Sequence, residues 1–136
     1  MKKVITNHKV LGDERGQLVA IESGVHIPFE IKRVFYIYGT QPNLHRGQHA
    51  HRKTQQYLIA ASGSCRVTLD DGKEKVSYLL DQPHIGLFQD AMVWGTMHDF
   101  SPDCVLLVLA NEHYNDADYI RSHNTFKRLA SDCKQV

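Results

Sequence analysis

The feature that most constrains the fold of this sequence is a succession of short segments rich in β-branched and aromatic residues, separated by turn residues. The clearest case alternates apolar and polar positions over Cys65–Asp70, turns at Asp71-Gly72 and resumes the alternation over 75–80. Such alternation is typical of strands with one face in a core. The pattern therefore predicts an all-β sandwich or small barrel.

Nine segments have this strand character. The predicted strands are Gln17–Glu22, Ile31–Tyr38, Gln48–His51, Gln56–Ala61, Cys65–Asp70, Lys75–Leu80, Ile85–Phe88, Val93–His98 and Cys104–Ala110. The end of the chain differs, because Asn115–Asp118 offers N-cap side chains before Tyr119, and Asn124 precedes the helix-like segment 125–129. We therefore expect one or two short C-terminal helices.

The length and charge of the chain limit its partners. A chain of 136 residues has the size of one domain, so we expect a single domain over residues 1–136. Lys and Arg number 16 and Asp and Glu number 15, so the net charge of +1 provides no general attraction to nucleic acid or to an acidic membrane. The longest apolar run, 105–110, is far below the roughly 20 residues of a membrane helix. We expect neither partner.

The cysteines indicate a cellular compartment. Cys65, Cys104 and Cys133 are far apart, odd in number and form no Cys-x-x-Cys pair, which argues against a disulfide framework and against a zinc ribbon. The start of the chain has no apolar core of signal-peptide length. We therefore expect a protein of the reducing cytoplasm.

Chemistry-bearing residues are concentrated in Arg46–His51, where His49 and His51 form a His-x-His pair before an apolar strand. Residues two apart in a strand project to the same face of the sheet, so both imidazoles are expected in one pocket. Imidazole exchanges protons near neutral pH and is also a common metal ligand. The pair indicates proton transfer or metal binding; the alternative is two structural polar residues at a barrel mouth or on a loop.

The surroundings of the pair resemble the first motif of the cupin superfamily, in which a Glu follows His-x-His by three or four residues. Here that position falls on Gln55 or Gln56. The His of the second cupin motif falls on Thr96, and His98 lies two residues late. Because a neutral amide is a weak ligand and first-row metals normally need three or four protein donors, these residues favour a metal-free acid-base pair.

Several segments together, in order and spacing, resemble the sugar 3,4-ketoisomerases that act on dTDP-4-keto-6-deoxyglucose. These are Asp13–Gly16, Ile27–Tyr38, Arg46–His51, Gly63–Cys65, Leu80–Pro83, Phe100–Ala110 and Asp118–Arg121. The resemblance implies a homodimeric cupin barrel, or jelly roll, that binds a dTDP-linked 4-keto-6-deoxyhexose without a metal or organic cofactor. It implies an isomerase of deoxysugar biosynthesis that moves the carbonyl from C4 to C3.

The residues support this chemistry. Removal of the acidic C3 proton of a 4-keto sugar produces an enediol, and the shift is complete once C4 is protonated and another proton has moved between the oxygens. Two adjacent imidazoles can supply the base and the shuttle. The resemblance assigns these roles to His49 and His51 and leaves open which of them contacts carbon.

Five further residues are candidates for substrate binding. Arg33 and Tyr36 lie on opposite faces of one predicted strand, and only one face enters the barrel. An inward Arg33 could bind the pyrophosphate or polarise a sugar oxygen; an outward one is a solvated charge. Arg46 precedes a glycine that permits close backbone approach, and Trp94 lines the pocket or packs in the core. Arg15, in an early turn, favours by resemblance the 3-keto-6-deoxygalactose product.

Three other functions fit the same fold. One is a 3,5-epimerase of the same nucleotide sugars, which removes protons beside the same carbonyl. Another is a metal-dependent cupin such as a dioxygenase, with His49, His51, Gln55 or Gln56, and His98 as ligands. The third is a cupin that binds a sugar or small anion without turnover.

Overall fold

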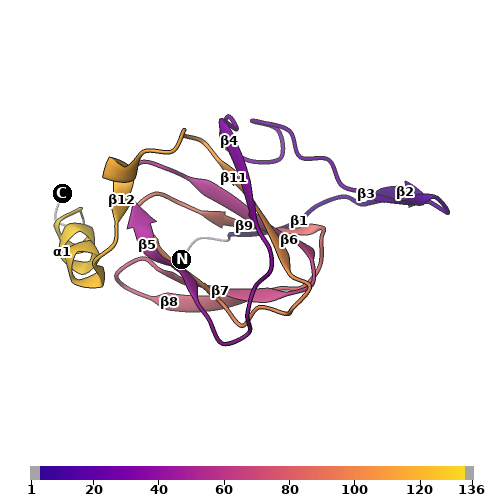
Figure 1. The fold of residues 1–136 in the computed structure, drawn as a ribbon. Helices are drawn as coiled ribbons and strands as arrows, with labels where there is room; N and C mark the ends of the chain where they lie inside the picture. Colours follow the sequence, from indigo (N-terminus) through magenta and orange to yellow (C-terminus); the bar gives the residue numbers. More distant parts are fainter. Residues whose placement is uncertain (1–3, 134–136) are drawn as a thin grey trace.

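Two five-stranded sheets face each other and a helix lies at one end of them, in a computed structural model that describes residues 4–133 (Figure 1). The elements are β1 (Ile5–Asn7), β2 (Leu11–Asp13), β3 (Gly16–Leu18), β4 (Arg33–Ile37), β5 (Arg46–His51), β6 (Gln56–Ser62), β7 (Cys65–Asp70), β8 (Lys75–Leu80), β9 (Ile85–Gln89), β10 (Trp94–His98), β11 (Val105–Ala110), η1 (Asp116–Asp118), β12 (Tyr119–Ile120) and α1 (His123–Cys133). The predicted all-β cupin barrel with a short C-terminal helix is confirmed.

The strand order places segments distant in sequence side by side. The first sheet has the order β1-β9-β6-β11-β4, and the second has the order β12-β5-β10-β7-β8. The named strands in both sheets pair antiparallel. Consequently β5, which carries the histidine pair, lies in the second sheet between β12 and β10.

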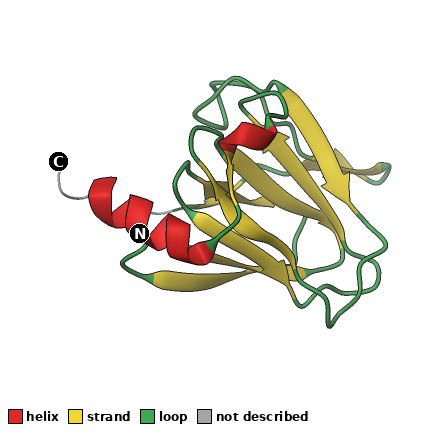
Figure 2. Ribbon diagram, turned by 60° about the vertical axis from the view of Figure 1, so that its left-hand side comes forward, coloured by secondary structure: helices red, strands yellow, loops and turns green. Residues whose placement is uncertain are grey.

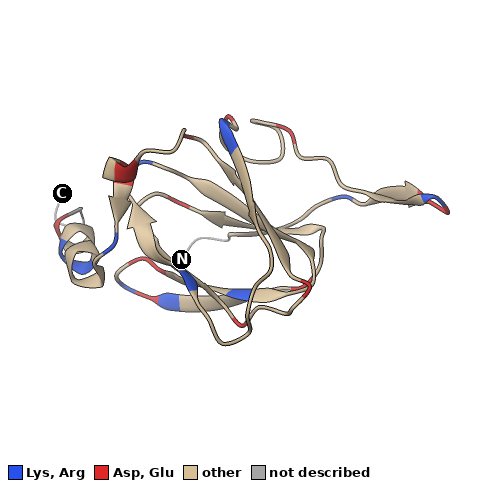
Figure 3. Ribbon diagram, viewed as in Figure 1, with Lys and Arg blue, Asp and Glu red and all other residues tan. Residues whose placement is uncertain are grey.

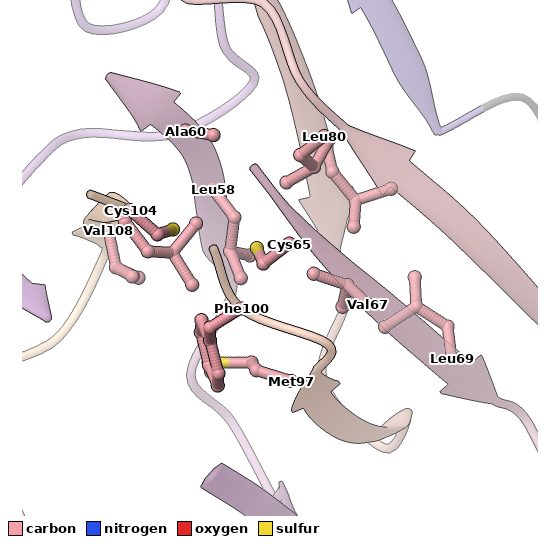
Figure 4. Packing of buried hydrophobic residues seen from close by; sticks show 12 residues of the cluster. Leu58, Ala60, Cys65, Val67, Leu69, Leu80, Met97, Phe100, Cys104 and Val108 are labelled. Atoms are coloured by element: carbon pink, nitrogen blue, oxygen red, sulfur yellow. The ribbon is translucent and has the colours of Figure 1, made fainter. Parts of the chain in front are cut away.

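The core lies between the two sheets and takes alternate residues from strands such as β6, β7 and β11 (Figure 4). Leu58, Val67, Leu106 and Val108 are fully buried in it. Burial of such a side chain contributes roughly 1.5–3 kcal/mol. Cys65 belongs to the same cluster, and burial raises the pKa of its thiol to about 12, so that it packs as a small uncharged side chain.

The N-terminal part differs from the prediction. The strand expected over Gln17–Glu22 is wrong in extent, because β3 ends at Leu18 and pairs with β2 in a separate hairpin. This hairpin projects away from the two sheets, and both signs of charge lie at its tip (Figures 1 and 3). Strands β1, β2 and β12 were not predicted, because two or three residues are too few to show an alternation.

The C-terminal part contains one turn of 3-10 helix and one α-helix (Figure 2). Helix α1 begins at His123, before the predicted start, and packs Phe126 and Ala130 against Ala50 and Ile120 on the outer side of β5 and β12. None of the helices described between residues 4 and 133 has the length and apolar character needed to cross a membrane. The side chain of Cys133 lies outside the described residues.

Candidate active site

The two histidines of β5 point into the barrel from one face of the strand. Ala50 between them packs outward under α1, so the alternation of the strand turns His49 and His51 inward. Their ring centroids are 4.9 Å apart and the rings are nearly perpendicular. His51 is 2% exposed and His49 is half-buried. The two imidazoles therefore lie side by side, and His49 is the more exposed of the two.

A β-bulge before the pair determines the tautomer of His49. Gly47 and Gln48 both have positive φ, and a Cβ on Gly47 would lie 2.9 Å from the carbonyl oxygen of Gly95, so only glycine fits there. Nδ1 of His49 lies 3.0 Å from the carbonyl oxygen of Gly47. Because a carbonyl only accepts, Nδ1 carries the proton, and Nε2 of the neutral ring retains a lone pair.

Strand β12 supplies a third ring. Tyr119 pairs with His51, and its ring centroid lies 4.8 Å from that of His49 and 4.5 Å from that of His51. The guanidinium of Arg121 lies over the same tyrosine ring, 4.4 Å from its centroid. A positive charge is thereby held close to both histidines.

Burial dominates the acid-base properties of the pair. Burial lowers the pKa of His49 below 6.5; the hydrogen bond to the Gly47 carbonyl opposes this, and the charge of Arg121 adds to it. The pKa of His51 falls to about 4, through burial first and then the charge of His49, with Asp118 acting in the opposite direction. Both rings are therefore uncharged at neutral pH, and each can accept a proton.

Asp118 holds the chain that leaves the histidine strand. Its carboxylate accepts hydrogen bonds from the backbone N–H groups of Lys53 and Thr54, at 2.8 and 3.1 Å, and from the Thr54 hydroxyl. Burial raises the pKa of Asp118, but these hydrogen bonds outweigh it and the pKa is lowered. The ionised carboxylate thus anchors the residues after His51.

Polar side chains also line the facing sheet. Arg33 of β4 lies opposite Ala110 of β11, Ala110 lies opposite Gln56 of β6, and Gln56 lies opposite Gln89 of β9. The two glutamines are 2% and 3% exposed. Arg33 is on the face of β4 shared with the core residue Phe35, so the inward orientation is the one that the structure adopts.

The other candidates for substrate binding lie away from the histidines of this chain. Arg15 forms an exposed ion pair with Asp13 at the hairpin tip, 2.6 Å apart. Tyr36 is 62% exposed on the outer face of β4. Arg46 lines a separate cavity of about 180 Å³ at the other end of β5. Trp94 packs with α1 on the outer side of β10.

Two of the donors considered for a metal, Gln55 and His98, have other hydrogen-bond partners. Gln55 hydrogen-bonds to Asp90 and Asn111, and His98 lies beside Thr68 with 2.7 Å between Nε2 and the hydroxyl. Residues 4–133 contain no group of three or more His, Cys, Asp or Glu side chains that could hold a metal ion.

Sequence reasoning missed Asp118, Tyr119 and Arg121 as individual site residues. They lie in a segment that carried the family resemblance, but their strand is only two residues long. No periodicity could have indicated that Tyr119 pairs with a residue 68 positions earlier in the chain, as the register Tyr119↔His51 shows. The resemblance itself was the only available signal.

Comparison with known sequences identifies a family and a relative. A family profile described as FdtA: WxcM-like, C-terminal, matches residues 1–131. The TDP-4-oxo-6-deoxy-alpha-D-glucose-3,4-oxoisomerase of Aneurinibacillus thermoaerophilus is 49% identical over 128 residues, which cover 94% of this chain and 92% of that protein.

Among solved structures, 3,4-ketoisomerases are also similar to this chain. A 3,4-ketoisomerase from Helicobacter canadensis superimposes with a TM-score of 0.92 at 45% identity, covering 94% of this chain and 96% of that one. A histidine-to-asparagine variant of the 3,4-ketoisomerase QdtA from Thermoanaerobacterium thermosaccharolyticum, in complex with TDP-4-keto-6-deoxyglucose, superimposes with a TM-score of 0.91 at 38% identity. That match covers 94% of this chain and 93% of QdtA.

Proposed function

The chain belongs to the FdtA family of WxcM-like C-terminal proteins, it is a sugar-nucleotide 3,4-ketoisomerase, and we propose that its substrate is TDP-4-keto-6-deoxyglucose. The name of the Aneurinibacillus relative and the ligand of the QdtA complex support this substrate. Within the chain, the observation that carries the proposal is the buried pair of imidazoles, of which His49 presents an unprotonated Nε2.

His49 acts as the base toward carbon. Its Nε2 takes the proton from C3, the electrons of that bond form the C3–C4 double bond, and the C4 carbonyl oxygen gains a proton to yield an enediol. The pKa below 6.5 keeps His49 uncharged at neutral pH, as this step requires. Its greater exposure favours it over the fully buried His51 for contact with the sugar ring.

His51 relays the proton on the oxygen side. The proton of the C3 hydroxyl leaves as the C3 carbonyl forms, and C4 accepts a proton. C3 is thereby oxidised and C4 reduced, so the reaction is balanced within the substrate. The 4.9 Å between the two ring centroids allows both imidazoles to reach adjacent atoms of one hexose.

Arg33 and Arg121 are the cations assigned to the pyrophosphate. Arg121 lies over Tyr119, and Arg33 lies over Tyr114, whose ring is 5.6 Å from that of Tyr119. Guanidinium groups match phosphate oxygens in geometry and charge. Both cations thus flank one aromatic pair beside the histidines, while the assignment of Arg46 to the ligand stays a prediction.

The active unit that we propose is a homodimer. Leu11 and Leu18 are 46% and 56% exposed on the projecting hairpin, and Val34 and Tyr36 are 56% and 62% exposed on the outer face of the first sheet. Apolar surface of this kind marks interaction sites. A second copy that covered these surfaces would bring Arg15 and Tyr36 to the interface. Light scattering at micromolar concentration tests this, and a monomer would contradict it.

Two finer assignments rest on the sequence alone. The preference for the 3-keto-6-deoxygalactose product is implied by the family resemblance at Arg15, and the cytoplasmic location is predicted from the cysteine usage. The single-domain organisation over residues 1–136 also stays a prediction.

An NMR time course in D2O tests the function. With TDP-4-keto-6-deoxyglucose as substrate, we expect a 3-keto product that carries deuterium at C4, because the proton added there exchanges with solvent. A substrate that keeps its carbonyl at C4 and exchanges protons at C3 and C5 would indicate an epimerase. Substrate binding without exchange at C3 would indicate a binding protein, and either result would contradict the proposal.

A further inference from the structure

Four polar atoms at the histidine end of the barrel are buried without a hydrogen-bond partner among residues 4–133. They are Nε of Arg33, Nε2 of His51, Oε1 of Gln56 and Oε1 of Gln89. Each comes from a different strand: β4, β5, β6 and β9. Because buried polar atoms are nearly always satisfied by protein or by ordered water, four such atoms together point to a small polar ligand.

Three of the four residues, Arg33, Gln56 and Gln89, belong to one row on the inner face of the first sheet. Arg33, Ala110, Gln56 and Gln89 form one cross-strand row, so each lies directly beside the next. Ala110 is fully buried and has only a methyl group, which leaves room above β11 between Arg33 and Gln56. Within the row, only the methyl group of Ala110 therefore stands between Arg33 and Gln56.

From this row, the amide of Gln89 reaches Gly95 of β10 in the second sheet, and β5 of that sheet carries His51. Gly95 pairs with His49, and a Cβ on Gly95 would lie 2.5 Å from Nε2 of Gln89, so the glycine makes room for that amide. Nε2 of Gln89 donates to the carbonyl of Val93, which leaves its Oε1 free. The backbone of His51 meets the same turn, because its carbonyl accepts a hydrogen bond from Met92.

The four atoms match the hydrogen-bonding capacity of one water molecule. The amide oxygens of Gln56 and Gln89 only accept, Nε–H of Arg33 only donates, and Nε2 of His51 can do either. We propose that one buried water binds here, donates to Gln56 and Gln89, and accepts from Arg33 and from a protonated Nε2 of His51. All four atoms are then satisfied together.

The water determines the tautomer of His51. With its proton on Nε2, the ring has its lone pair on Nδ1, whereas His49 has its proton on Nδ1 and its lone pair on Nε2. The two imidazoles of the pair are thus opposite tautomers. Gln56 and Gln89 act as positioning residues, since they act through the water. Only this catalytic consequence rests on the proposed function; the water and the tautomer do not.

The test is long-range ¹H–¹⁵N NMR on protein labelled with ¹⁵N-histidine. We expect the neutral Nε2–H form for His51, the Nδ1–H form for His49, and an exchange or NOE peak between the His51 ring proton and a long-lived water. An Nδ1–H form of His51, or no water peak at its Nε2–H, would overturn the proposal. Because this spectrum needs no substrate, a different substrate would leave its outcome unchanged.

Gln89→Met tests the role of the amide, with Gln55→Met as the matched control just before β6. We expect Gln89→Met to weaken the water peak, to populate the other His51 tautomer and to lower kcat about tenfold with little change in KM. Gln55→Met should leave the His51 tautomer unchanged. Gly95→Ala should reproduce Gln89→Met, because its methyl displaces the amide. An unchanged tautomer in both Gln89→Met and Gly95→Ala would overturn the assignment.

Discussion

The inner faces of the same strands line two different regions of the barrel. In one region, Leu58 of β6 and Leu87 of β9 belong to a fully apolar cluster. At the next inward position of each strand lie Gln56 and Gln89, which are nearly as buried as the leucines but are polar, and each has an amide oxygen without a hydrogen-bond partner among the described residues. The backbone is continuous through both regions, so the difference lies in the side chains. The apolar region stabilises the strands, and the polar region uses that rigid frame to hold reactive groups.

The largest effect is expected from removing His49, the proposed general base of the polar region. We expect His49→Gln to lower kcat/KM for TDP-4-keto-6-deoxyglucose by about 10³-fold, because a positioned general base typically contributes 10²–10⁴. The NMR assay measures this effect. The thermal midpoint should stay near that of the wild type, and His113→Gln, at an exposed histidine, serves as the control. Wild-type turnover by His49→Gln would contradict its role.

A substitution in the apolar region should lower the stability of the protein without changing its catalytic rate. We expect Leu58→Ala to lower the free energy of unfolding by about 2–5 kcal/mol, because it leaves a cavity in a fully buried cluster. Urea unfolding measures this change, and kcat per folded molecule should be nearly unchanged. Leu79→Ala, at a residue 46% exposed on β8, should cost no more than about 0.5 kcal/mol. Equal losses in the two variants would be evidence against this view of the core.

The polar region should make stability depend on pH. A pKa of about 4 for folded His51, against 6.5 in the unfolded chain, means that only the unfolded state binds this proton between those pH values. The free energy of unfolding should therefore fall by about 3 kcal/mol from this group as the pH drops from 6.5 to 4. Urea unfolding across this range should show a shallower slope for His51→Leu. The same slope in both proteins would refute the buried neutral state.

The smallest expected effect comes from removing the positive charge of Arg121 beside the two histidines. Arg121 lowers the pKa of His49, so Arg121→Gln should raise that pKa. Since the protonated form of His49 is inactive, the acidic limb of the kcat/KM profile should move to higher pH. Arg128→Gln, at an exposed position on α1, is the matched control. A limb that stays in place would show that Arg121 acts on substrate binding alone.

Much of the barrel could be predicted from local patterns. Strands β7 and β8 have the predicted bounds, because each has six alternating residues around a clear turn. The inward orientation of His49 and His51 also followed from strand alternation. The hairpin β2–β3 and the strand β12 were not predicted, because such short strands depend on partners and carry no period of their own.

The sequence by itself determined the fold class, the sheet-forming segments and the two histidines on one face of a strand, because these depend on alternation over a few neighbouring residues. Only the tertiary structure decided that Tyr119 lies against both histidines with Arg121 over its ring, that Arg33 points inward, and that Gln56 and Gln89 are buried side by side in the first sheet. The tautomer of His49 likewise required the bulge at Gly47. These contacts join residues from different strands, and their register is a property of the closed barrel that no local pattern contains.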